Sequence, residues 1–175
     1  MRVVRAARRR LPGGRDHRGR QVRPAPRLMR ANLDSNVLVY ALLEPHGDKG
    51  AIALDIINRT SGRGAIATQA LGELLWVTRR RRSDLVSDAI QLITWLRQAF
   101  TIVDTTPELL LAAADLNARH QVPFWDAVIW KAGASIGAGL FVTEDLQDGF
   151  VTGGVRVLDP FNSANAAELD RLLPA

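Results

Sequence analysis

From residue 29 onward, the chain alternates short apolar runs with longer segments in which apolar residues recur at helical spacing. The short runs have the length of buried strands and lie at about residues 30–33, 65–68, 100–103, 140–143 and 155–158. The longer segments predict helices at about residues 34–42, 50–59, 69–79, 84–98, 107–119, 123–136 and 166–173. Such alternation is typical of a parallel sheet with helices on both faces. The sequence therefore predicts a three-layer α/β/α domain with a central parallel sheet.

Length and composition narrow the class of protein. A chain of 175 residues is expected to form one domain. No apolar run approaches the roughly 18 residues that a transmembrane helix needs. The chain contains no cysteine, which excludes disulfides, thiol nucleophiles and cysteine-based zinc sites. We therefore expect a cytoplasmic protein that has no membrane partner.

The net charge of +5 is distributed unevenly along the chain. Residues 1–28 contain ten arginines and one acid, whereas residues 29–175 contain 13 basic and 17 acidic side chains. Proline and glycine interrupt the arginine-rich part, which predicts a disordered extension. This extension either grips RNA or lies upstream of the true initiator, Met29. Mass spectrometry of the natively expressed N-terminus decides between the two.

Four acids follow the predicted strands or open the predicted helices. Asp34 follows the first strand, Glu73 lies early in the helix after the second, Asp126 opens a helix, and Asp145 follows the strand at 140–143. Carboxyl ends of parallel strands lie at one edge of a sheet, so these side chains are expected to converge there. Carboxylates crowded together favour a bound cation, and oxygen ligands favour Mg²⁺ or Mn²⁺.

Each acid also has an ordinary structural explanation. Asp34 and Asp126 stand where aspartate caps the N-terminus of a helix. Glu73 fits a solvated acid near the start of its helix. Asp145 lies in a polar turn of residues 143–149. The residues alone leave both the metal site and these structural roles open.

Four short segments resemble the PIN-domain nucleases, and most closely the VapC toxins of VapBC (type II) toxin–antitoxin systems. The resemblance extends over about residues 29–161, and the segments occur in the order found in that family. They are Leu-Asp-Ser-Asn-Val-Leu-Val-Tyr at 33–40, Leu-Gly-Glu-Leu-Leu at 71–75, Phe-Trp-Asp-Ala at 124–127 and Val-Thr-Glu-Asp-Leu-Gln-Asp-Gly at 142–149.

The resemblance implies a PIN-like fold for residues 29–175 and an Mg²⁺-dependent endoribonuclease that hydrolyses RNA phosphodiester bonds, with Mn²⁺ as a substitute metal. It also implies a homodimer and neutralisation by a small VapB-like antitoxin. Carried over to this sequence, the catalytic and metal-binding acids are Asp34, Glu73, Asp126 and Asp145. Asp148 is expected as an additional ligand, directly or through water, and Thr143 and Asn36 as side chains that orient the acids.

Two other functions fit parts of the sequence. A haloacid-dehalogenase-like phosphatase also has an aspartate after the first strand, but it needs a second two residues later, where this chain has Asn36. A non-catalytic module that binds RNA or protein would use the N-terminal arginines and Arg79–Arg82. The four acids argue against such a module, because without a metal they repel phosphate.

Basic and aromatic side chains outside the four segments have open roles. Arg79–Arg82 fits either an RNA- or antitoxin-binding cluster or a solvated helix end. Trp76, Trp95 and Trp130 fall on apolar faces of predicted helices. We expect these tryptophans in the core or at a dimer surface.

Overall fold

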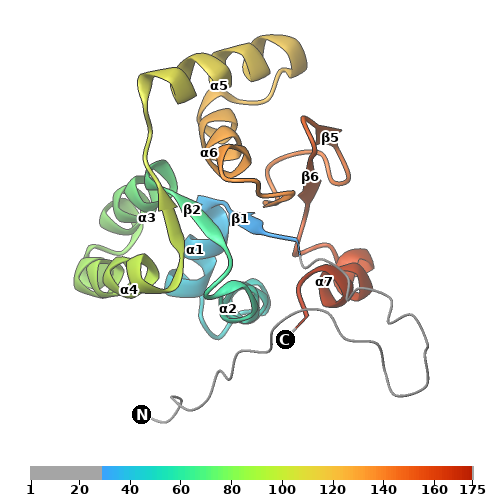
Figure 1. The fold of residues 1–175 in the computed structure, drawn as a ribbon. Helices are drawn as coiled ribbons and strands as arrows, with labels where there is room; N and C mark the ends of the chain where they lie inside the picture. The colour runs from blue at the N-terminus through green and yellow to red at the C-terminus, as the bar shows by residue number, and fades with distance from the viewer. Residues whose placement is uncertain (1–28, 175) are drawn as a thin grey trace, which may run out of the picture.

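The computed structural model describes residues 29–174 (Figure 1). Its strands are β1 (Ala31–Leu33), β2 (Ala65–Ala67), β3 (Thr101–Val103), β4 (Leu140–Val142), β5 (Val151–Thr152) and β6 (Val155–Leu158). Its helices are α1 (Ser35–Leu43), α2 (Asp48–Thr60), α3 (Thr68–Arg81), α4 (Val86–Ala99), α5 (Pro107–His120), α6 (Phe124–Ser135) and α7 (Ala166–Leu172). The predicted extension at 1–28 lies outside the described residues.

The strands form one sheet in the order β3-β2-β1-β4-β6-β5. The pairs β1–β2, β2–β3, β1–β4 and β4–β6 are parallel, which confirms the central parallel sheet. The short strand β5 was not predicted, and it pairs antiparallel to β6 at the sheet edge. Gly153 and Gly154 form the turn between them with φ of 57° and 78°, a conformation that glycine adopts without strain.

The strand order places the helices in two layers. The connections from β1 to β2 and from β2 to β3 run in one direction along the sheet, so their helices α1–α4 lie on one face. The connection from β3 returns past β1 to β4, which places α5 and α6 on the opposite face (Figure 1). The order therefore reverses between β1 and β4, and ligands of open α/β sheets bind at such a switch point.

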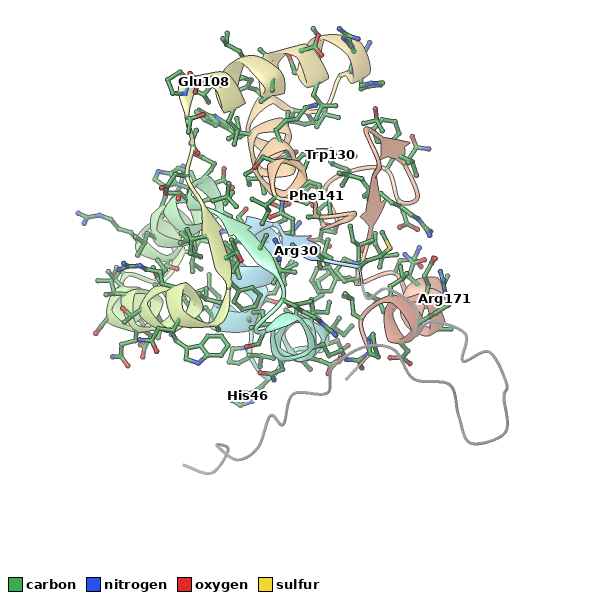
Figure 2. The ribbon with its side chains drawn as sticks, viewed as in Figure 1. Arg30, His46, Glu108, Trp130, Phe141 and Arg171 are labelled. Atoms are coloured by element: carbon green, nitrogen blue, oxygen red, sulfur yellow. The ribbon has the colours of Figure 1, made fainter. Side chains whose placement is uncertain are left out.

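The face covered by α6 shows how closely helix and sheet pack. Trp130 of α6 is buried and meets Phe141 of β4 edge to face, with ring centroids 5.6 Å apart (Figure 2). Gly133 of α6 faces Asn32 of β1, and a Cβ atom at position 133 would lie 2.5 Å from the Asn32 Cβ. Asn32 donates through Nδ2 to the Ile129 carbonyl of the same helix, at 2.8 Å. These contacts fix α6 against β1.

Of the three tryptophans predicted to lie in the core or at a dimer surface, only Trp130 lies in the core. Trp76 and Trp95 are 61% and 42% exposed, so a core position is wrong for both, and a position at a dimer surface stays a prediction. Each lies on a helix whose buried face is made by other side chains, such as Leu74 in α3 and Leu96 in α4.

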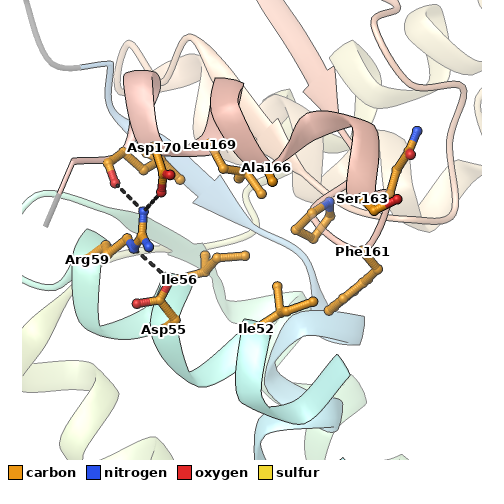
Figure 3. A pocket seen from close by; sticks show the side chains of 12 residues that line it. Ile52, Asp55, Ile56, Arg59, Phe161, Ser163, Ala166, Leu169 and Asp170 are labelled. Carbon is orange, nitrogen blue, oxygen red and sulfur yellow. Dashed lines mark hydrogen bonds and ion pairs between the residues drawn. The ribbon is translucent and has the colours of Figure 1, made fainter. Parts of the chain in front are cut away.

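The C-terminal helix α7 lies beside α2, and an apolar cavity of about 300 Å³ separates them (Figure 3). Arg59 of α2 pairs with Asp55 of its own helix and with Asp170 of α7, at 2.6 and 2.5 Å. None of the four predicted site acids lines this cavity. Across residues 29–174, the helices lack the combination of length and apolarity needed to cross a membrane.

Candidate metal centre

Asp34 lies at the switch point of the sheet, directly after β1 and at the N-cap of α1. Its backbone N–H donates to the Val142 carbonyl of β4, at 3.1 Å. Its carboxylate accepts hydrogen bonds from the Ser35 N–H and the Thr143 hydroxyl, each at 2.6 Å. The side chain is 1% exposed. Asp34 therefore caps the helix, as one interpretation of the sequence proposed, and also places a buried carboxylate between β1 and β4.

Burial raises the pKa of Asp34 from its ordinary value of 3.8 to about 7, because the charged form loses its water. The hydrogen bond from Thr143 opposes this effect by stabilising the charged form. The negative charges of Asp126 and Asp145 raise the pKa further. The protein thus keeps a carboxyl group in a place where its negative charge is unfavourable, as expected where a cation is to bind.

Asp126 lies in the first turn of α6, two residues after the helix begins at Phe124. The N-cap is Pro123, so the alternative prediction that Asp126 caps this helix is wrong. The side chain is half-buried, and burial is the largest cause that raises its pKa to about 6. The charges of Asp145 and Glu73 add to the increase.

Glu73 and Asp145 are held by side chains of α1. The Ser35 hydroxyl donates to Glu73 Oε2 at 2.7 Å, and Gln69 Nε2 donates to Oε1 at 3.0 Å. Asn36 Nδ2 donates both to Asp145 Oδ2 and to Thr143 Oγ1, each at 3.1 Å. The hydroxyl of Thr143 therefore joins two acids, because it also accepts from the Asp145 N–H at 3.1 Å.

The expected orienting contacts of Thr143 and Asn36 are thus present. Ser35 and Gln69 are further orienting side chains that were not predicted from the sequence. Ser35 directly follows Asp34, so the hydroxyl at this position was the available signal. Its contact with Glu73 depends on how α3 packs against α1, and the sequence contains no direct sign of that packing.

The four predicted acids come together at one edge of the sheet. Their negative charges interact. The charges of Asp126 and Asp145 raise the pKa of Asp34, and the charges of Asp145 and Glu73 raise the pKa of Asp126. All of the donors are carboxylate oxygens, which suit Mg²⁺ or Mn²⁺. The donor chemistry therefore fits a divalent metal ion.

The four acids are not arranged to coordinate one ion jointly. Within residues 29–174, no three His, Asp or Glu side chains are placed so that one ion could bind all of them. Like charges favour separation, and Ser35 and Asn36 hold Glu73 and Asp145 in their positions. Binding one ion through three acids therefore requires rotation of side chains at the rim of the site, where Asp126 and Glu73 are half-buried and Asp145 is exposed.

The structure places Asp148 outside this group. One carboxylate oxygen of Asp148 accepts from the Asp159 N–H at 3.0 Å, and the other from Asn165 Nδ2 at 2.9 Å. Desolvation acts to raise the pKa of Asp148, but these hydrogen bonds and the charge of Arg156 lower it below the ordinary value. Asp148 therefore ties the loop after β4 to the C-terminal segment.

A second set of side chains, the Tyr40–Lys49–Glu144 cluster, fixes the loop that carries Asp145. The carboxylate of Glu144 accepts from the Tyr40 hydroxyl at 2.6 Å and pairs with Lys49 of α2. Lys49 also donates to the Tyr40 hydroxyl at 3.1 Å. Asn36 and Tyr40 are one helical turn apart on α1, so this helix binds two consecutive residues of the loop.

This cluster predicts a role for Glu144 in placing Asp145. An Asp145 side chain on a less restrained loop binds a metal less well, so Glu144→Ala is expected to weaken affinity for Mn²⁺ about tenfold, within the range for partners that orient ligands. Isothermal titration calorimetry measures this affinity. Tyr40→Phe, which removes one of the contacts, is expected to have a smaller effect. Unchanged affinity in a folded Glu144→Ala protein would contradict the role.

Comparison with known families identifies this architecture. The model of the PIN domain family matches residues 32–148, which include most of β1, all of β4 and all four acids. The chain belongs to the PIN-domain family. Because the match begins within β1 and ends in the loop after β4, the candidate metal centre lies entirely within the PIN domain. A search of curated proteins gave no match.

Solved structures share the fold at low sequence identity. The VapC20 toxin of Mycobacterium tuberculosis, described as cleaving the sarcin–ricin loop, gives a TM-score of 0.57 at 17% identity over 72% of this chain and 98% of its own. A DNA-bound VapBC of Salmonella typhimurium gives 0.57 at 17% identity, over 75% and 98%. A toxin–antitoxin complex from Klebsiella pneumoniae gives 0.56 at 16% identity, over 75% and 97%. This PIN domain therefore has the fold of VapC structures.

Proposed function

We propose that this PIN domain is a VapC-like toxin, an endoribonuclease that hydrolyses RNA with the help of Mg²⁺. The observation that carries the proposal is the buried Asp34 carboxyl at the switch point of the sheet, with three further acids at the same edge. The VapC-like fold supports it, as does the all-oxygen donor set. Mn²⁺ is the expected substitute metal.

In the proposed mechanism, Asp34, Glu73, Asp126 and Asp145 would hold the metal. When bound, Mg²⁺ supplies Lewis acidity that makes water a better nucleophile and offsets charge on the phosphodiester. Thr143 keeps the Asp34 carboxylate in place, and Asn36 does the same for Asp145. Because the acids repel phosphate on their own, RNA and metal are expected to bind together.

The proposal includes a protein partner and a second copy of the chain. The solved relatives include VapBC complexes, and their likeness supports a VapB-like antitoxin that neutralises this protein. A homodimer is the expected assembly of the free toxin. Co-expression with the product of the neighbouring reading frame, followed by size-exclusion chromatography, tests both expectations.

The proposed activity predicts metal-dependent RNA cleavage by the purified full chain. A mixed RNA pool is incubated with Mg²⁺, with Mn²⁺ and with EDTA, and the products are resolved on a denaturing gel. Cleavage is expected with either metal and is lost in EDTA, because the acids alone cannot offset phosphate charge. Cleavage that persists in EDTA would refute the metal-dependent mechanism.

A further inference from the structure

A groove lined by two exposed tryptophans opens between α3 and α6. Its volume is about 470 Å³, and it is lined by Gln69, Gly72, Glu73, Trp76 and Val77 of α3 and by Trp125 of α6. Trp76 is 61% exposed and Trp125 is 52% exposed. Single exposed apolar side chains are common, but apolar side chains that adjoin one another on a surface mark a site where another molecule binds.

The groove is continuous with the candidate metal centre. Glu73 lines the groove, and its negative charge also raises the pKa of Asp126. Trp125 directly precedes Asp126 in the first turn of α6. Trp125 is held from one side by Phe124, with ring centroids 5.1 Å apart and an interplanar angle of 65°. A molecule lying in the groove therefore lies next to the acids.

Positive charge borders the same groove. The Arg80 guanidinium lies over the Trp76 ring, 5.3 Å from its centroid. Arg79, Arg80 and Arg81 form the last turn of α3, and Arg82 caps its C-terminus. Arg82 pairs with Asp84, whereas the three preceding residues are exposed on α3. Aromatic faces combined with arginines are the arrangement by which proteins hold single-stranded nucleic acid, through stacked bases and neutralised phosphates.

We propose that the groove between Trp76 and Trp125 is a base-stacking subsite for single-stranded RNA, which places a neighbouring phosphodiester at the four acids. This inference rests on the proposed ribonuclease function and identifies where its substrate is held. An unpaired base offers the flat face that an indole ring stacks on, whereas bases within a duplex are already stacked on one another. The adjoining arginines make a polyanion the favoured occupant of the groove.

The first test compares aromatic and non-aromatic side chains at the two positions. With the full chain and a single-stranded RNA, Trp76→Ala and Trp125→Ala are each expected to raise KM about tenfold, the scale of losing one stacked base. Trp76→Phe and Trp125→Phe are expected to restore most of the loss, because phenylalanine keeps a stacking face. Trp95→Ala is the matched control, since Trp95 is 42% exposed on α4 and outside the groove.

A second variant blocks the groove without removing a tryptophan. A Cβ atom at Gly72 would meet no atom within 4 Å, so a larger side chain there has room to enter the groove. Leucine forms helices better than glycine, so Gly72→Leu is expected to fold. Its KM for the RNA is expected to rise at least as much as that of Trp76→Ala. A KM equal to that of the wild type in both variants would overturn the subsite.

Binding measurements separate this inference from the proposed activity. Fluorescence anisotropy of a labelled single-stranded RNA, measured with Mg²⁺ and with every variant in an Asp126→Asn background that suppresses cleavage, reports affinity even if the wild type cleaves nothing. Weaker binding by Trp76→Ala and by an RNA with abasic positions supports the subsite. Equal binding of intact and abasic RNA overturns it. The proposal is also overturned if the wild type sediments as a dimer, Trp76→Ala sediments as a monomer, and the two proteins bind RNA equally well. That result would assign the groove to contacts between copies of the chain.

Discussion

RNA cleavage by an Asp126→Asn protein is expected to fall by more than about 100-fold. Removing a side chain that only orients a metal ligand costs up to about 100-fold, and removing a ligand itself is expected to cost more. Asparagine keeps the shape of the side chain but removes the charge that would attract the metal. The protein is expected to stay folded, because burial and the charges of Asp145 and Glu73 already disfavour a charged Asp126. Initial cleavage rates with saturating Mg²⁺ measure the effect.

Asp115→Asn is the matched control for this experiment. Asp115 lies on α5, is exposed, and pairs with Arg119 one helical turn away. The same chemical change is made there without touching the site, so cleavage is expected to match the wild type. An Asp126→Asn protein with the wild-type rate and circular dichroism spectrum would refute the role of Asp126.

In the absence of metal, the free energy of unfolding is expected to fall as the pH rises from about 4 to about 7. Folded Asp34 keeps its proton up to about pH 7, whereas an unfolded aspartate loses it near 3.8. Between these values the folded state binds more protons than the unfolded state, so raising the pH favours unfolding. The shift sets an upper bound of about 4 kcal/mol on this contribution.

The matched variant for the pH experiment is Asp34→Asn, which cannot titrate at this position. Urea unfolding in EDTA at pH 5 and pH 8 gives the change in free energy of unfolding for each protein. The change is expected to be larger in the wild type by at most about 3 kcal/mol, because only the two pH units between 5 and the folded pKa of about 7 fall within this range. Any hydrogen bond lost to Thr143 cancels because it is lost at both pH values. Equal changes in the two proteins would contradict a raised Asp34 pKa.

The periodicity of the sequence was sufficient to predict the parallel sheet and its helices, because both depend on local patterns of apolar residues. The strand β5 was missed because two residues are too few to show alternation. Its turn was nevertheless visible in the sequence, since the pair Gly153-Gly154 is a typical hairpin signal.

The edge where the acids meet was predictable from chain order, because the carboxyl ends of parallel strands always share an edge. The contacts that hold the acids there were less accessible. The pairing of Glu144 with Lys49 joins residues 95 positions apart, and it depends on the orientation of α2 relative to the loop after β4. Exposure of Trp76 was unpredictable for a similar reason, since an apolar residue near a helix face is buried only if another element covers it.

The insertion of β4 beside β1 has a consequence for the timing of synthesis. Thr143 and Asp34 are 109 positions apart, and their contact forms only after β4 has paired with β1. A chain still attached to the ribosome therefore lacks a complete set of acids until β4 and Asp145 have been synthesised and β4 has paired with β1. If the protein is a ribonuclease, its own messenger is read past the codon of Asp145 before the product can cut RNA.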